Sequence, residues 1–277
     1  MGTLISVLGF GSIVGLSLGL TGGGGAIFAV PLLVYGLEVS SKEAIAVSLA
    51  SVGVTALVGF WQRWRIGQVE VRTGLMFAAA GMLGTPIGTW IADRLPDSLL
   101  LLLFAVLMLI VAARMWWQAR PKTTAAADAA VAALPPDCDG PTCRRDANGS
   151  LLLNTPCAIL LLDVGLMTGV LTGLFGVGGG FVIVPALVLF SSMSMHRAVG
   201  TSLMVVAMVS MAGFATRMWS GQRIPVETTL LFVSGAVAGL MAGHQMAHRL
   251  SGPSLQRVFA VAIVLVAAFV IVRNVAF

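Results

Sequence analysis

The chain has 277 residues, of which 58% are hydrophobic and only 10% are charged, and its mean hydropathy is +0.99. Roughly a quarter of the residues of a soluble domain are charged, so this composition excludes an ordinary soluble protein and predicts an integral membrane protein. The formal net charge of +5 comes from Lys and Arg residues between the apolar stretches. Basic residues in that position set orientation in the membrane and do not indicate nucleic-acid binding.

Eight apolar stretches follow one another along the chain, and most approach the roughly 20 residues that cross a bilayer core. They cover residues 4–37, 44–62, 73–92, 98–117, 157–190, 198–216, 228–247 and 255–276. The sequence therefore predicts an all-α, polytopic integral membrane protein.

The two halves of the chain repeat one another at a constant offset of 154 residues. Residues 15–34, GLSLGLTGGGGAIFAVPLLV, align without a gap on residues 169–188, and ten of the twenty positions are identical. We expect two homologous four-segment repeats, residues 1–117 and 157–277, joined by a polar linker at 118–156. Within the linker, the Asn-Gly pair of RRDANGSLLL predicts a small hairpin.

Each half contains glycines of two kinds. Spaced glycines lie four residues apart, on one helical face, and predict close helix packing. They are Gly11, Gly15 and Gly19, with Gly165, Gly169 and Gly173 in the second half. Clustered glycines lie at 22–25 and 176–180, and each cluster precedes an apolar run with a proline. A glycine destabilises a helix by about 1 kcal/mol relative to alanine, so we expect a helix break at each cluster.

The broken segments indicate where a substrate binds. A 34-residue helix would be roughly 50 Å long, too long for one crossing. Interrupted helices at matching positions of two repeats are typical of the midplane site of a transporter, and the N–H groups freed at a break suit an anion. A kink that serves packing alone is the alternative. A nucleotide-binding loop is excluded, because GVGGGF lacks the last glycine of that motif.

The candidate site residues come from the breaks and from the polar groups that follow them. The predicted substrate-binding residues are Gly22, Gly23, Gly24, Gly25, Pro31, Ser48, Gly176, Gly178, Gly179, Gly180, Pro185, Thr201 and Ser202. Anion-binding or coupling roles are considered for Arg63, Gln68, Arg217, Gln222 and Asp163. The alternatives are hydroxyls bonded to their own helix or to a neighbouring helix, arginines that anchor a helix end, and an interfacial Asp163. We expect no catalytic residue, metal or cofactor.

The stretch GLFGVGGGFVIVPALVL, followed by AVGTSL, resembles the sulfite exporter TauE/SafE family, also called the 4-toluene sulfonate uptake permease family. The first half carries a diverged copy, GLTGGGGAIFAVPLLV with AIAVSL. The resemblance implies a secondary transporter of sulfite, sulfonates or related organosulfur acids in the bacterial cytoplasmic membrane, with export as the expected direction and protons or cations as candidate coupling ions. Where the family often has threonine, the second half has Thr201 but the first has Val47, so we expect the second half to contribute more.

Other functions are weighed against the transporter. A passive anion channel fits the same composition. An intramembrane serine protease is suggested by Gly-x-Ser-x-Gly around Ser17, but the second half keeps both glycines and replaces the serine with Leu171. His244 and His248 share a helix face without further metal ligands. The three cysteines are expected to be reduced next to a cytoplasmic linker.

Orientation follows from the distribution of Lys and Arg. If all eight segments cross, eleven of these residues lie on the side of both termini and the linker and five lie opposite, which places the termini and the linker in the cytoplasm. If segments 1 and 5 turn back, the repeats are inverted and the count is again 11 to 5. The repeated Arg-x-x-x-Gly-Gln loops at Arg63 and Arg217 favour parallel halves.

Overall fold

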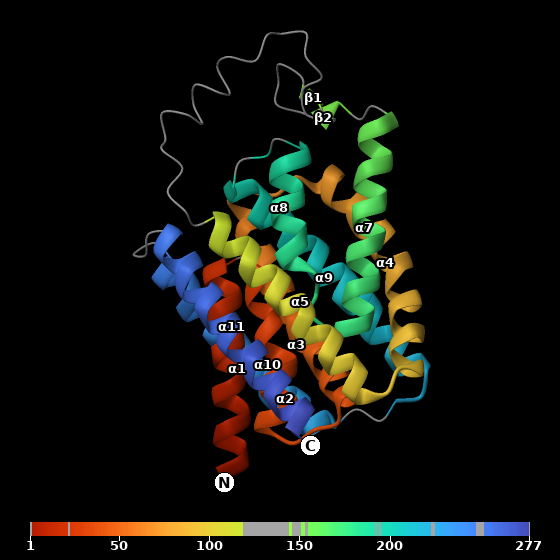
Figure 1. Cartoon of the computed structure of the whole chain (residues 1–277). Helices are drawn as coiled ribbons and strands as arrows, with labels where there is room; N and C mark the ends of the chain where they lie inside the picture. Colours follow the sequence, from red (N-terminus) through yellow and green to blue (C-terminus); the bar gives the residue numbers. More distant parts are fainter. Residues whose placement is uncertain are drawn as a thin grey trace.

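The computed structural model describes residues 2–21, 23–118, 144–145, 151–152, 155–191, 193, 195–222, 225–247 and 252–276. Helices of both halves pack into one bundle (Figure 1). The first half forms α1 (Gly2–Thr21), the 3-10 helix η1 (Gly24–Phe28), α2 (Ala29–Gly36), α3 (Ser41–Arg65), α4 (Val71–Arg94) and α5 (Asp97–Gln118). The second half forms α7 (Thr155–Phe175), α8 (Gly180–Ser191), α9 (Met195–Trp219), α10 (Val226–Ala247) and α11 (Gly252–Ala276).

The helices confirm an all-α polytopic membrane protein. Five helices in the described part of the chain, α3, α4, α7, α9 and α10, are long and apolar enough to cross a membrane. In the linker, strand β1 (Arg144–Arg145) pairs antiparallel with β2 (Leu151–Leu152), as the hairpin prediction requires. The Asn-Gly pair between them lies outside the described residues.

Both predicted helix breaks are present. The helix α1 ends at Thr21 and η1 begins at Gly24, while α7 ends at Phe175 and α8 begins at Gly180. After each break the chain folds back along the helix that it has just left. Gly25 lies against Ser17, and Gly36 lies against the ring of Phe10. The first segment is therefore a helical hairpin that returns toward the end of the molecule at which it started.

The equivalent helices of the two halves run in opposite directions. Adding the repeat offset to the bounds of α3 gives the bounds of α9. These two helices cross antiparallel, because Gly59 of α3 faces Leu203 of α9 while Gly213 of α9 faces Leu49 of α3. The two contacts exchange equivalent residues, which is the signature of a two-fold relationship. Of the two arrangements that the sequence left open, the halves adopt the inverted one and not the parallel one that the repeated loops favoured, because a hairpin followed by three crossing helices reverses the direction of the next half.

The strands β1 and β2 of the linker lie at the end of the bundle opposite to both chain ends (Figure 1). Figure 1 places N and C together at one end and β1 and β2 at the other. The arrangement expected if all eight segments cross, with the termini and the linker on one side, is therefore not the one present. It assumed that segments 1 and 5 each cross the membrane once, whereas each of them turns back.

Glycine stripes hold the two halves together. A Cβ atom on Gly15 of α1 would overlap the carbonyl oxygen of Ala236 on α10, and one on Gly169 of α7 would overlap that of Gly81 on α4. The predicted small-residue packing is thus present, and it joins helices from different halves. The helices α5 and α11 form a third pair across the halves.

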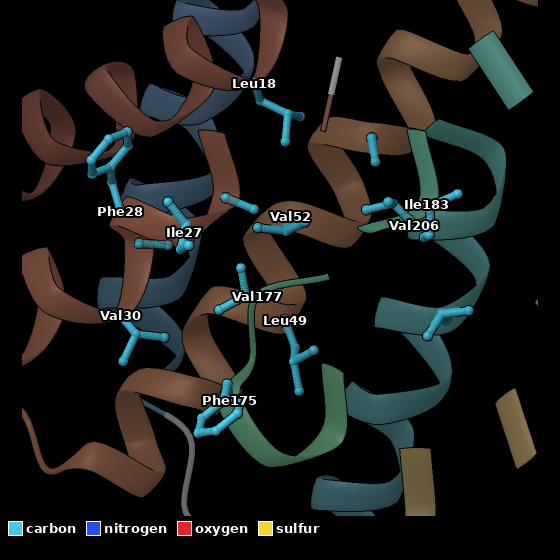
Figure 2. Packing of buried hydrophobic residues seen from close by; sticks show 14 of the residues in the cluster. Leu18, Ile27, Phe28, Val30, Leu49, Val52, Phe175, Val177, Ile183 and Val206 are labelled. Carbon is cyan, nitrogen blue, oxygen red and sulfur yellow. The ribbon is translucent and has the colours of Figure 1, made fainter. Parts of the chain in front are cut away.

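The hydrophobic core surrounds the two breaks. In Figure 2, Val52 of α3 lies between Ile27 of η1 and the pair Ile183 and Val206 of α8 and α9. Val177, from the second break, packs into the same cluster and is 1% exposed. The breaks therefore lie inside protein, which is the environment that unwound backbone needs at membrane depth.

Candidate functional site

The two glycine breaks touch each other in the centre of the bundle. A Cβ atom on Gly180 would lie 2.7 Å from the Cα of Gly23, closer than real side chains approach. Gly23 has a φ of 144°, and Gly178 and Gly179 have φ values of 69° and 65°. Such conformations are strained for any residue with a side chain, so glycine is required here both for the fold of the chain and for the close approach.

The second break leaves backbone donors without partners close to this contact. Gly176 donates its N–H to the carbonyl of Thr172, and the carbonyl of Gly179 accepts from the N–H groups of Val182 and Ile183. Within the described chain, no bond is found for the N–H groups of Gly178 and Gly179. These groups lie just before the first residue of α8, where the positive end of the helix dipole favours an anion.

Buried hydroxyls lie on α3 and α9, the two helices that pack beside this break. Ser48 of α3 donates to the carbonyl of Gly176 at 2.7 Å and so ties the break of the second half to the first half. Ser51 of α3 and Ser210 of α9 are completely buried, and their hydroxyls have no partner among the described residues. The Oγ of Ser210 lies 3.1 Å from the position of a Cβ on Gly178.

Ser51 and Ser210 were missed by sequence reasoning. Ser51 is three residues after Ser48 and therefore lies on the same face of α3, a signal that the sequence already contains. Ser210 has no such signal, because position 56 in the first half is alanine and no repeat supports it. A buried hydroxyl without a partner is rare and indicates either stored strain or an absent ligand.

Thr201 and Ser202 have their hydroxyls engaged with backbone groups. The Oγ1 of Thr201 accepts from the N–H of Glu70, next to the start of α4, at 3.0 Å. Ser202 donates to the carbonyl of Val199, three residues earlier in its own helix, at 2.9 Å. The bond of Ser202 within its own helix and the contact of Thr201 with a neighbouring segment are the two alternatives to a substrate role.

Arg217 lies at the centre of a polar cluster, at the end of the bundle that carries the chain termini. The residue is fully buried, and it donates to the side chain of Gln222 at 3.0 Å and to the carbonyl of Gly173 at 3.2 Å. Its Nη1 is 3.6 Å from Oδ1 of Asp93, which also accepts from Gln222. The predicted Arg-Gln pair is brought together, but Asp93 was not predicted. Arg217 thus ties the ends of α4, α7 and α9 together.

Arg63, the equivalent arginine of the first half, has different surroundings. It is half-buried and donates to Gln68 at 3.3 Å. It lines a narrow cavity with Gly19, Gln62 and His244. In the part of the chain that the structure describes, no carboxylate forms an ion pair with Arg63.

The remaining candidates lie away from the contact between the breaks. Asp163 is exposed on a face of α7 that also exposes Ile159 and Leu162. Pro31 lies buried in α2 and, with Ser17, lines an apolar cavity of about 470 Å³ next to α11.

The remaining predicted residues belong to the breaks or to the helices that follow them. Gly22 is outside the described residues, Gly24 and Gly25 begin η1, and Pro185 lies within α8.

Two further sequence interpretations change with the structure. Ser17, on which the protease interpretation rests, lines the apolar cavity beside α11, whereas His244 lines the cavity of Arg63, so these two residues lie in different cavities. Cys157, in the first turn of α7, is disulfide-bonded, so the prediction of a reduced cysteine is wrong for this residue. The other two cysteines, Cys138 and Cys143, lie outside the described residues.

Comparison with known proteins decides the family. The family model described as "Sulfite exporter TauE/SafE" matches residues 7–270. The chain belongs to the sulfite exporter TauE/SafE family. Its members are membrane transporters rather than enzymes, so the chain is a multi-pass membrane transporter.

The names of similar proteins agree with a membrane transporter. A protein of Xylella fastidiosa named "Probable membrane transporter protein" is 33% identical over 98% of this chain and 96% of its own length. The Bacillus subtilis protein named "Probable membrane transporter protein YdhB" is 26% identical over 73% of each chain. No solved structure matches the chain significantly.

Proposed function

We propose that this TauE/SafE transporter is a secondary carrier that exports small sulfur oxyanions, such as sulfite, sulfonates or related organosulfur acids. The observation that carries the proposal is the set of unpaired donors on the second break and on the helices α3 and α9 that pack beside it. The N–H groups of Gly178 and Gly179 and the hydroxyls of Ser51 and Ser210 lie in the core without partners among the described residues. Donors of this kind stabilise an anion that has lost its water.

The chemistry of these donors selects the substrate class. The three oxygens of a sulfite or sulfonate group accept several hydrogen bonds at once, and backbone N–H groups with serine hydroxyls provide donors from more than one direction. The buried side chains around the contact are aliphatic, including Val52 and Val206. Because no buried acid lies among them, a cation would have no counter-charge here.

Alternating access then needs two bodies that move about this site. The two halves of the sequence do not serve as the bodies, because the glycine stripes lock α1 onto α10 and α7 onto α4. We propose instead that the hairpin of α1 and α2 moves with α3 and α10, and that the hairpin of α7 and α8 moves with α9 and α4. The antiparallel crossing of α3 and α9 is the surface on which the two bodies slide.

The charge distribution supports one orientation in the inner membrane. With hairpins in place of crossings, eleven Lys and Arg residues belong to the linker end and five to the end that carries the termini. Cytoplasmic loops carry the excess of basic residues. We therefore propose that the linker is cytoplasmic and that both termini face the periplasm.

Flux measurements test the function. Protein reconstituted in liposomes should take up labelled sulfite with saturation, and sulfite or a sulfonate inside the vesicles should accelerate the uptake. A thermal-shift screen over sulfite, sulfate, thiosulfate and sulfonates ranks the substrates. Flux without saturation or acceleration would instead indicate an anion channel, and no response to any sulfur anion would contradict the substrate class.

A further inference from the structure

The same motif, Arg-x-x-x-Gly-Gln, lies at the ends of α3 and α9, and the arginines of its two copies have different polar partners. In the second copy, the guanidinium of Arg217 and the amide of Gln222 both contact the carboxylate of Asp93. In the first copy, Arg63 donates to Gln68 as Arg217 does to Gln222. The residue at the repeat position of Asp93 is Ala247, so the first copy has no equivalent carboxylate.

Other described groups do not replace the missing carboxylate. The acid nearest in the chain to Gln68 is Glu70, whose carboxylate accepts from Thr73. His244 and Gln62, which line the cavity of Arg63, carry no negative charge. A half-buried guanidinium with no counter-ion is the feature that a bound anion completes.

We propose that Arg63 binds an oxyanion in the place that Asp93 takes beside Arg217, and that this ion is the transported sulfur anion at the linker end of its path. This proposal rests on the proposed function. The cavity beside Arg63 holds only about 10 Å³, roughly the space of one water, so the ion binds at the mouth of the cavity. Gln62 and His244 line the same cavity.

Two sources supply an oxyanion at a membrane surface. One is the transported ion and the other is the phosphate of an anionic lipid, since both offer oxygens to a guanidinium. The transported ion is favoured by position, because Gly19, two residues before the end of α1 at the first break, lines the same cavity. An ion bound at Arg63 would therefore lie next to the end of α1 that leads into the first break.

Binding of labelled sulfite tests the site. The protein is placed in nanodiscs of phosphatidylcholine, and the number of ions bound per chain is measured for the wild type, Arg63→Gln and Ala247→Asp. We expect both variants to bind one ion fewer, because the first removes the guanidinium and the second supplies an internal carboxylate. Arg72→Gln, which removes an exposed charge at the same end of the bundle, should bind as the wild type does. Unchanged binding in both Arg63→Gln and Ala247→Asp would overturn the proposal.

Transport measured with substrate on one side of the membrane at a time distinguishes a role at this site from a role in the central site. With substrate added at the linker side, Arg63→Gln should raise KM about tenfold, the loss expected for a charged hydrogen bond, and should leave KM at the opposite side unchanged. An equal rise on both sides would place Arg63 in the central site and contradict a role at the linker end of the path.

A further experiment tests the oxyanion site even if the protein does not transport sulfite. If the wild type neither binds nor moves sulfite, the nanodiscs are repeated with phosphatidylglycerol and the retained lipid is counted. Retention that is lost in Arg63→Gln but kept in Arg72→Gln supports the oxyanion site and assigns it to lipid phosphate. Equal retention in all variants overturns it.

Discussion

Gly23 and Gly180 lie against each other where the two helical hairpins meet, so close that neither position accommodates a Cβ atom without a shift of the opposing backbone. This contact joins the breaks of the two halves at one point. It also places the free N–H groups of the second break beside the first half, and it therefore defines the centre of the proposed site.

Replacing Gly180 tests the contact. In Gly180→Ala the new methyl group would lie 2.7 Å from the Cα and the carbonyl oxygen of Gly23. We expect sulfite flux to fall at least about tenfold, because a displacement near 1 Å at a binding site costs on that order or more. Gly9→Ala is the control, since nothing lies within 4 Å of that position and flux should stay normal. Normal flux in Gly180→Ala would contradict a site at this contact.

The two serines near the second break should behave differently when replaced. Ser48→Ala removes the hydrogen bond to the carbonyl of Gly176, so we expect a loss of about 1 kcal/mol in the free energy of unfolding. Ser210→Ala removes a hydroxyl without a described partner, so the thermal midpoint should stay the same or rise while KM for sulfite rises. The exposed Ser234→Ala serves as the control for both measurements. An unchanged KM in Ser210→Ala would remove this residue from the site.

Asp93 should stabilise the fold through Arg217. In Asp93→Asn, the buried guanidinium loses its counter-charge, and we expect the free energy of unfolding to fall by about 1–3 kcal/mol. The thermal midpoint in detergent measures this, with Asp97→Asn as an exposed acid for comparison. In Arg217→Met combined with Asp93→Asn, the loss should be smaller than in Asp93→Asn alone, because no charge is left buried. A midpoint equal to that of the wild type in Asp93→Asn would show that the pair does not stabilise the protein.

The glycine stripe between α1 and α10 should tolerate no side chain. Gly15→Ala places a methyl group into the carbonyl of Ala236, so the helices must separate and the thermal midpoint should drop by several degrees. Gly9→Ala, six residues earlier in the same helix, should raise the midpoint slightly, because alanine is the better helix former. A similar midpoint in both variants would contradict close packing of the two helices.

The state of Cys157 reports the orientation of the linker end. Cys157 is disulfide-bonded in the structure, whereas a cytoplasmic linker end is exposed to glutathione. The proposed orientation therefore requires this disulfide to be reduced in intact cells that are quenched with an alkylating reagent. The number of alkylated cysteines, counted by mass, measures this. A disulfide that persists in quenched cells would place the linker end in the periplasm and reverse the proposed orientation.

Much of the local structure is predictable from the sequence because it depends on neighbouring residues. Consecutive glycines prevent a helix wherever they occur, so both breaks follow from composition alone, and the offset of 154 relates the bounds of α3 to those of α9. Spaced glycines at Gly15 and Gly169 predicted close packing. Which helices they would contact was not predictable, because a small face fits any partner.

Only the tertiary structure decided how the halves are related and which polar groups meet. Parallel and inverted halves give the same 11 to 5 distribution of basic residues, so electrostatics did not separate them, whereas the reciprocal contacts of Gly59 and Gly213 do. Likewise Arg217 and Asp93 lie in different halves, and the hydroxyl of Ser210 becomes notable only because burial leaves it without a partner. Burial and pairing are properties of the packed chain, since they depend on residues far apart in sequence.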